Sequence, residues 1–263
     1  NPKLLVFTVQ MMLMLVLGHV LALSESVNSV ISYAVKRCNS TSKAATIVTF
    51  FTILVSLFNW GLGLIFGAIF AKKVGEHASV NNIKINYPLI GACGYSGLMV
   101  WHGGISGSAP IKVAESGHFL SEQIGVISQS ETIFSTMNIS VSILLLIVLP
   151  ALMYIIGNKE SGEKIVLPSK IKKAKEIPII DAEKLDNSKF LAWMFGGAIL
   201  IYAFYKALIM PENITLKVIT PNYINLLLLA IGIIMHKTFI NFLKAIDNAI
   251  VGSSGILIQF PLY

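Results

Sequence analysis

The sequence predicts an all-α membrane protein, a helical bundle that contains a re-entrant hairpin and a discontinuous helix. Hydrophobic residues make up 55% of the chain and charged residues only 13%, whereas a soluble domain carries about 25% charge. The charges lie mainly between apolar runs, and polar clusters interrupt two of these runs. The apolar runs are Leu4–Leu23, Ala44–Ala71, Tyr87–Trp101, Met137–Gly157, Phe190–Met210 and Tyr223–Met235.

The net charge of +7 fits loops on the cytoplasmic side of a membrane. The cations flank apolar runs and do not form a patch interleaved with aromatic residues. We therefore expect the lipid bilayer as a partner and no nucleic acid. Cys38 lies beside Lys36 and Arg37, whereas Cys93 lies inside an apolar run. Two cysteines in such different surroundings predict free thiols, with neither a disulfide framework nor a metal site.

The distribution of lysines sets the expected topology. Segment 158–189 contains eight lysines together with Pro168 and Pro178, and the positive-inside bias predicts that it is a loose cytoplasmic linker. Met137–Gly157 then runs from outside to inside. Residues 105–136 are therefore expected outside, and Lys84 is expected inside.

The first two elements follow from length and pattern. Leu4–Leu23 has the length of a membrane span, and further spans follow it, so it is not a cleaved signal peptide. Ser24–Tyr33 is expected to form an amphipathic helix at the interface.

The run Ala44–Ala71 is predicted to form a re-entrant hairpin with 59–63 at its tip. A single crossing would place the cationic segments 36–43 and 72–84 on opposite faces, and one of them would violate the positive-inside bias. Arms of about fifteen and ten residues reach roughly 22 and 15 Å, which brings the tip near the middle of a core about 30 Å thick. One tilted helix of about 28 residues with a buried asparagine is the alternative.

Three residues at this tip, Asn59, Trp60 and Gly61, are candidate substrate-binding or ion-binding residues. The amide oxygen of Asn59 suits coordination of a cation, and an interhelical hydrogen bond is the alternative role. Trp60 is as well suited to packing as to forming a wall of the site.

The run that begins at Tyr87 is interrupted at Trp101–Pro110 by three glycines, two serines and a proline. Such a stretch cannot hold a regular helix. Open backbone inside a bilayer survives only where protein or water satisfies its polar groups, and discontinuous helices of this kind bind solutes and ions. We expect this stretch to meet the hairpin tip halfway through the lipid. Free N–H groups attract carboxylates and open carbonyls coordinate Na⁺, which makes candidates of His102, Gly103, Gly104, Ser106, Gly107 and Ser108.

Other interpretations of this stretch stay open at this point. A glycine-rich packing seam would also place glycines here. A hydrolase would need a complete Gly-x-Ser-x-Gly motif and a carboxylate to orient His102, and the segment has neither. We therefore predict that the protein is not an enzyme. His102 and His19 are also candidate proton carriers, although His19 suits an interfacial hydrogen bond equally well.

The second half of the chain is predicted to leave the linker through Phe190–Met210 and to return through Tyr223–Met235. Residues 239–251 have the spacing of an amphipathic interfacial helix. Glycines and serines at 252–255 then precede a truncated final span. Because the sequence begins without methionine and ends inside an apolar stretch, we expect a fragment of a longer protein.

Several stretches resemble the short-chain fatty acid transporter family of the AtoE type, within the ion transporter superfamily. They are Gly18-His19, Phe58 to Leu64, Tyr87-Pro88-Leu89, Gly103 to Pro110 and Gly255 to Pro261, and the glycine, serine and proline stretch is the most specific of them. The resemblance covers the whole chain.

This resemblance implies a multi-pass carrier of the bacterial cytoplasmic (inner) membrane that takes up short-chain fatty acids such as acetoacetate or butyrate. It implies two inverted repeats, with residues 1–157 as the first, lacking its first span, and 190–263 as the start of the second, on either side of the 158–189 linker. We expect ion-coupled symport by alternating access, with Na⁺ or H⁺ as coupling ion and no other cofactor. A passive anion channel is the alternative, and a homodimer is left open.

Overall fold

The computed structural model describes residues 2–159, 162–164, 183–211 and 215–259, and this part of the chain is almost entirely helical. No β-strand occurs in it, and only the residue pair Ile85 and Glu163 forms a β-bridge. The predicted linker 158–189 lies largely outside the described residues. The α-helices are α1 Pro2–Leu23, α2 Glu25–Val35, α3 Thr41–Phe58, α4 Trp60–Val80, α5 Tyr87–Tyr95, α6 Ser108–Val113, α7 Ser121–Ile124, α8 Thr136–Lys159, α9 Glu183–Asp186, α10 Lys189–Phe204, α11 Pro221–His236, α12 Phe239–Ile250 and α13 Ser254–Gln259.

Four helical segments within these ranges have the length and apolar composition needed to cross a membrane. This agrees with the predicted all-α membrane fold. They are Leu4–Leu23, Thr41–Phe58, Thr136–Lys159 and Lys189–Ile209.

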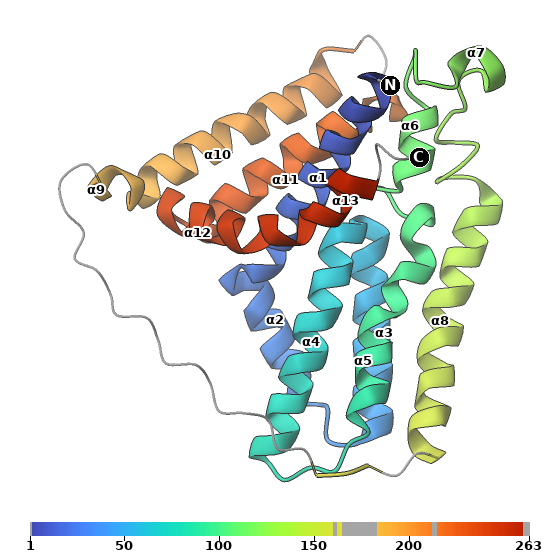
Figure 1. Ribbon diagram of the computed structural model, residues 1–263, viewed down its shortest axis with the longest axis vertical. Helices are drawn as coiled ribbons and strands as arrows, with labels where there is room; N and C mark the ends of the chain where they lie inside the picture. Colours follow the sequence, from blue (N-terminus) through green and yellow to red (C-terminus); the bar gives the residue numbers. More distant parts are fainter. Residues whose placement is uncertain (1, 160–161, 165–182, 212–214, 260–263) are drawn as a thin grey trace.

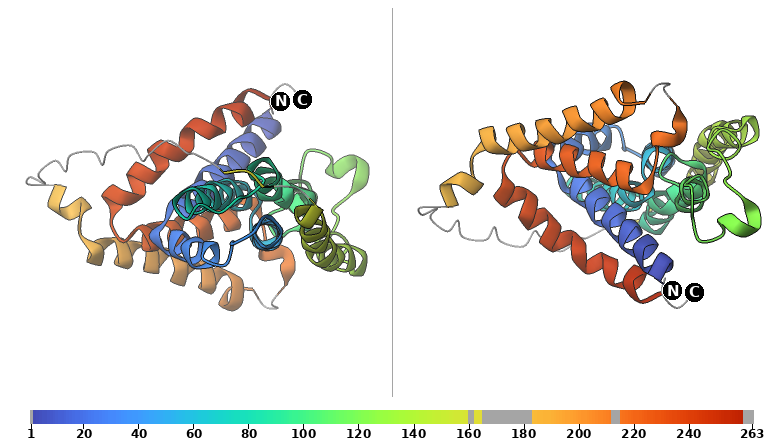
Figure 2. Two further views of the ribbon diagram at one scale, coloured as in Figure 1. Left: turned by 90° about the horizontal axis from the view of Figure 1, so that it is seen from below. Right: turned by 90° about the horizontal axis from the view of Figure 1, so that it is seen from above.

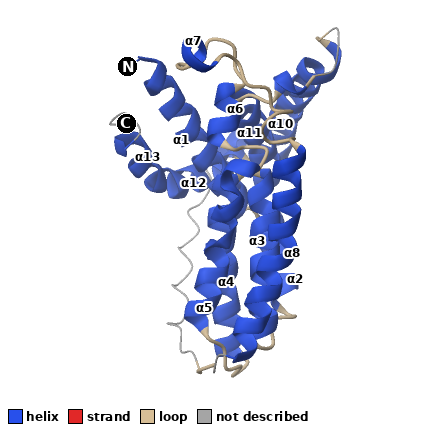
Figure 3. Ribbon diagram, turned by 90° about the vertical axis from the view of Figure 1, so that its right-hand side faces the viewer, coloured by secondary structure: helices blue, strands red, loops and turns tan. Residues whose placement is uncertain are grey.

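The helices form two groups around separate apolar cores. In Figure 1, α2, α3, α4, α5 and α8 run along the long axis, while α1 and α10 to α13 gather beside the upper part of the molecule. Figures 2 and 3 show the same division from other sides. One core joins α2 to α5 around Phe70 and Ile90, and the other joins α1, α11 and α12 around Met14 and Phe242. The N-terminal end of α4 belongs to the second core through Trp60.

Helices α3 and α4 form an antiparallel pair that meets at Asn59. Both cationic segments lie at the same end of the molecule, as the charge pattern predicts. Asn86 N donates to Thr41 Oγ1 over 3.1 Å, and Lys73 Nζ donates to Ser32 Oγ of α2 over 2.9 Å.

The arms of this pair differ from the prediction in length. Helices α3 and α4 contain 18 and 21 residues, against the expected fifteen and ten. Lys72 and Lys73 continue the helix because alanine, lysine and glutamate are strong helix formers. Only Asn59 interrupts the run, and the glycines at 61 and 63 are helical.

The predicted break after Tyr87 is present, but its boundaries differ. Helix α5 ends at Tyr95, and a 3₁₀ segment continues over Ser96–Gly103. Only residues 104–107 are non-helical, because α6 already begins at Ser108. Pro110 lies in the first turn of α6, where a missing N–H removes no intrahelical hydrogen bond.

Helices α4 and α5 cross in close contact at Gly67 and Gly94. A methyl group at Gly67 would overlap the carbonyl oxygen of Gly94 and would also lie 2.9 Å from Thr52 Cγ2. Backbone atoms cannot move aside as the end of a flexible side chain can, so this close crossing requires glycine at position 67.

Gly67→Ala is therefore expected to lower the free energy of unfolding by about 1–3 kcal/mol, the usual cost of overpacking. Thermal unfolding in detergent measures this change. Gly197→Ala is the control, because a methyl group there meets nothing within 4 Å. Equal midpoints for the two variants would contradict the tight crossing.

The second half has the predicted order of helices, but the last helix begins earlier than expected. Helix α12 is amphipathic and turns Phe242, Ala245 and Ala249 into the core. Leu243 and Ile250 of the same helix are 50% and 53% exposed. Helix α13 begins at Ser254, within the stretch 252–255 that is expected to precede the final span.

The two cysteines are free thiols, as predicted, and both are buried. Burial raises the pKa of the Cys38 thiol to about 12. It therefore stays protonated, which makes it a poor nucleophile.

Candidate functional site

Asn59 ends α3 and begins α4 in an extended conformation, with φ −146° and ψ 122°. Asparagine caps helices well in this conformation. Its side-chain Oδ1 accepts a hydrogen bond from Leu62 N over 2.7 Å. The residue is fully buried, so the hairpin tip places a whole amide side chain inside the protein.

The hairpin tip and the second break are in direct contact. Trp60 N donates to Ser106 Oγ over 3.0 Å, and Ile105 N donates to Leu57 O over 2.8 Å. Ser106 is fully buried. The hydroxyl of one break therefore satisfies a free N–H at the start of α4, and the two polar interruptions lie side by side.

Three aromatic rings extend this contact. The indoles of Trp60 and Trp101 stack with centroids 5.0 Å apart and planes 9° apart. The ring of His102 stacks on Trp101 with a centroid distance of 5.2 Å. His102 itself is exposed. Trp60 is thus a packing residue, one of its two predicted roles, and its role as a wall of a binding site stays a prediction.

Three buried donors at this contact have no hydrogen-bond partner among the described residues. They are Asn59 Nδ2, Trp60 Nε1 and Trp101 Nε1. An unsatisfied buried polar group costs about 1–3 kcal/mol. All three groups donate, so the group that would satisfy them is an acceptor such as a carboxylate.

The remaining candidates lie around this contact. Gly61 packs against α1, where a methyl group would lie 3.0 Å from Leu15 Cα. Gly107 N donates to Gly104 O over 2.9 Å, which closes the open stretch into a tight turn. Ser108 is buried at the start of α6.

The structure adds two site residues that the sequence analysis missed, Asn138 and Ser142 on α8. Asn138 Nδ2 donates to Gly103 O over 2.9 Å and to Ile133 O over 2.7 Å. These two polar residues lie four positions apart in an apolar helix and so share one helix face. That spacing is the signal in the sequence that marks them.

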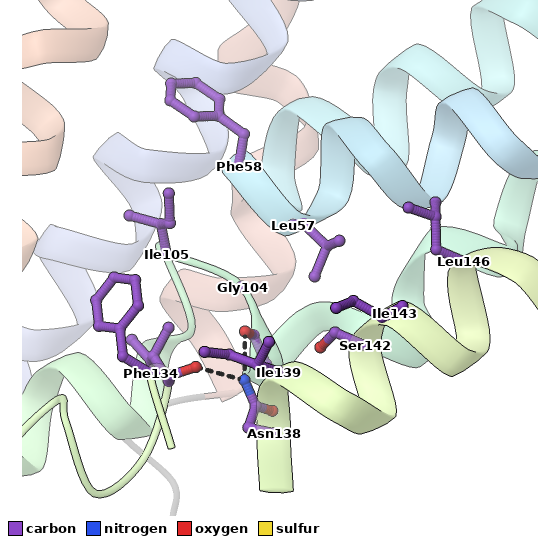
Figure 4. Close-up of a pocket in the computed structure, with 12 residues that line it drawn as sticks. Leu57, Phe58, Gly104, Ile105, Phe134, Asn138, Ile139, Ser142, Ile143 and Leu146 are labelled. Carbon is purple, nitrogen blue, oxygen red and sulfur yellow. Dashed lines mark hydrogen bonds between the residues drawn. The ribbon is translucent and has the colours of Figure 1, made fainter. Parts of the chain in front are cut away.

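A cavity of about 310 Å³ opens beside the break. Figure 4 shows it between the end of α3, the open stretch and α8. Its walls are mainly apolar, and Asn138 and Ser142 contribute polar side chains. The lining residues are Leu57, Phe58, Gly103, Gly104, Ile105, Ile133, Phe134, Asn138, Ile139, Ser142, Ile143 and Leu146.

A helical membrane bundle whose interior holds two helix breaks in contact has the architecture of a membrane transport protein. The chain belongs to the short-chain fatty acid transporter family. The family model described as "Short chain fatty acid transporter" matches residues 2–263.

Two relatives from Escherichia coli (strain K12) and Haemophilus influenzae (strain ATCC 51907 / DSM 11121 / KW20 / Rd) are both assigned by name to short-chain fatty acid transport. Each relative is 33% identical to this chain, and the matched region covers 99% of the chain. The chain spans only 59% of the length of each relative. No solved structure matches the chain significantly.

The family is one of transporters and not of enzymes, in agreement with the prediction. Its description does not favour a passive anion channel, which is the alternative function. Together with the apolar helices, it indicates a multi-pass membrane protein.

Proposed function

We propose that this chain forms part of a carrier that takes up short-chain monocarboxylates, coupled to an ion gradient, by alternating access. The observation that carries the proposal is the group of three unpaired buried donors where the two helix breaks meet. A carboxylate offers about four lone-pair sites. It is therefore an acceptor that suits a group of buried donors.

In this proposal the substrate carboxylate accepts hydrogen bonds from Asn59 Nδ2 and from the indoles of Trp60 and Trp101. Hydrogen bonds to a charged group are about twice as strong as neutral ones. Ser106 holds the start of α4 in place through Trp60 N. Its role is to keep the donors in position.

The coupling ion takes a separate part of the site. The Asn59 Oδ1 atom accepts one hydrogen bond, from Leu62 N, and an amide oxygen has a second lone pair. That lone pair is a suitable ligand for Na⁺. His102, stacked on Trp101, is the proton carrier if H⁺ is the coupling ion.

The proposal includes the membrane arrangement that the sequence predicts. Helices α3 and α4 form a re-entrant hairpin, because both of their outer ends lie at the cationic end of the molecule. In Figure 1 the junction of α3 and α4 stops short of the upper end, where α6 and α7 lie. Residues 1–157 then belong to one inverted repeat and 190–263 to the start of the other. The carrier lies in the bacterial inner membrane, and assembly as a homodimer belongs to the same proposal.

Uptake of labelled butyrate by vesicles that contain the full-length protein tests this function under imposed Na⁺ and pH gradients. Ser106→Ala is expected to reduce uptake about 5- to 150-fold, because a lost hydrogen bond and an orphaned N–H cost about 1–3 kcal/mol. Ser140→Ala on α8, where Ser140 is exposed, is the matched control.

Two results would contradict the proposal. Uptake that continues unchanged after both gradients collapse would exclude ion coupling. Uptake by Ser106→Ala at the level of the control would exclude this site.

A further inference from the structure

The cavity beside the break has walls that no other described segment covers. Phe58, Ile139 and Ile143 line it and are 45%, 43% and 54% exposed. Its volume of about 310 Å³ is at the lower limit of the 300–1,000 Å³ typical of ligand pockets. It therefore has room for a small apolar group.

The cavity and the donor site are neighbours along two stretches of chain. Leu57 and Phe58 line the cavity, and the next residue is Asn59. Gly103, Gly104 and Ile105 line it from the segment between Trp101 and Ser106. Each stretch therefore contributes both a cavity wall and a group of the donor site.

The cavity wall is also fixed to the break by hydrogen bonds. Asn138 joins α8 to the carbonyl groups of Gly103 and Ile133, and Figure 4 shows both bonds at the edge of the cavity. Both N–H groups of this amide are thereby used. Asn138 holds the cavity next to the break and does not itself offer a donor to an anion.

We propose that this cavity holds the alkyl chain of the carboxylate and sets the longest chain that is transported. The proposal rests on the function proposed above, in which the carboxylate binds at Asn59, Trp60 and Trp101. The apolar walls suit a hydrocarbon tail, and the side chains that line the cavity, among them Ile143 and Leu146, set the room available to it. One methylene group in a hydrophobic pocket changes discrimination about 10–200-fold.

Competition between acetate, butyrate and hexanoate for uptake tests the proposal in vesicles that contain the full-length protein. Ile143→Phe places a larger side chain in the cavity and is expected to lower the hexanoate-to-acetate uptake ratio about tenfold. Leu144→Phe is the matched control, because Leu144 is 58% exposed and does not line the cavity.

A second pair of variants enlarges the cavity. Leu146→Ala is expected to raise the hexanoate-to-acetate ratio, whereas Ile147→Ala, at a position that is 64% exposed and outside the lining, leaves it unchanged. This pair keeps the test decisive even if Ile143→Phe fails to fold.

The outcomes separate this inference from the proposed function. Wild-type uptake of acetate and butyrate with an unchanged ratio in both Ile143→Phe and Leu146→Ala would overturn the alkyl pocket and leave the carrier function standing. A membrane lipid chain or another part of the full-length protein would then occupy the cavity. Absence of any carboxylate uptake by the wild type would overturn the function itself.

Discussion

Gly104→Ala is expected to reduce butyrate uptake about a hundredfold or more. A methyl group at this position would lie 2.6 Å from Leu57 O and 2.9 Å from Ser56 O. Leu57 O is also the acceptor for Ile105 N, so the methyl group would push apart the backbone contact that joins the two breaks. Displacing a binding group by about 1 Å can cost a hundredfold in rate.

The same uptake assay measures this effect, with expression checked in the membrane fraction. Gly91→Ala is the control, because it lies on the preceding helix α5 and a methyl group there meets nothing within 4 Å. Wild-type uptake by Gly104→Ala would show that the two breaks do not need this contact.

The sequence predicts the helices of this protein well because membrane spans have a strong signal. Long apolar runs with flanking lysines predict the positions of α1, α3, α8 and α10. The charge pattern correctly predicts that the two cationic segments lie at the same end of the molecule. Helix ends are less well predicted. Lys72 and Lys73 are charged but favour helix, so α4 continues beyond its predicted end.

The candidate site is only partly predictable from sequence, for a physical reason. Local composition identifies Asn59 and the stretch near Ser106 as helix breaks, because asparagine caps helices and glycine and proline disrupt them. The stacking of Trp101 on Trp60 and the bonds of Asn138 to Gly103 depend on tertiary packing. No local pattern encodes such long-range contacts.

Asn59→Asp is expected to reduce uptake about a hundredfold while keeping the helix cap. Aspartate keeps an oxygen that can cap Leu62 N, since it caps helices as well as asparagine does. It replaces the unpaired Nδ2 donor with a second acceptor that faces the substrate carboxylate. A lost hydrogen bond to a charged group is worth about 1.5–3 kcal/mol, which is up to about a hundredfold in affinity.

Comparison with Asn59→Ala separates capping from binding. Alanine removes both the cap and the donor, so its thermal stability in detergent is expected to fall by about 1 kcal/mol, whereas Asn59→Asp keeps the cap and loses stability only through the burial of its charge. Both variants lose uptake if Nδ2 binds the carboxylate. If the side-chain oxygen serves only to bind the coupling cation, the added charge of Asn59→Asp strengthens ion binding and uptake persists at low Na⁺ concentration. That result would assign Asn59 to the ion and leave the two indoles as the carboxylate donors.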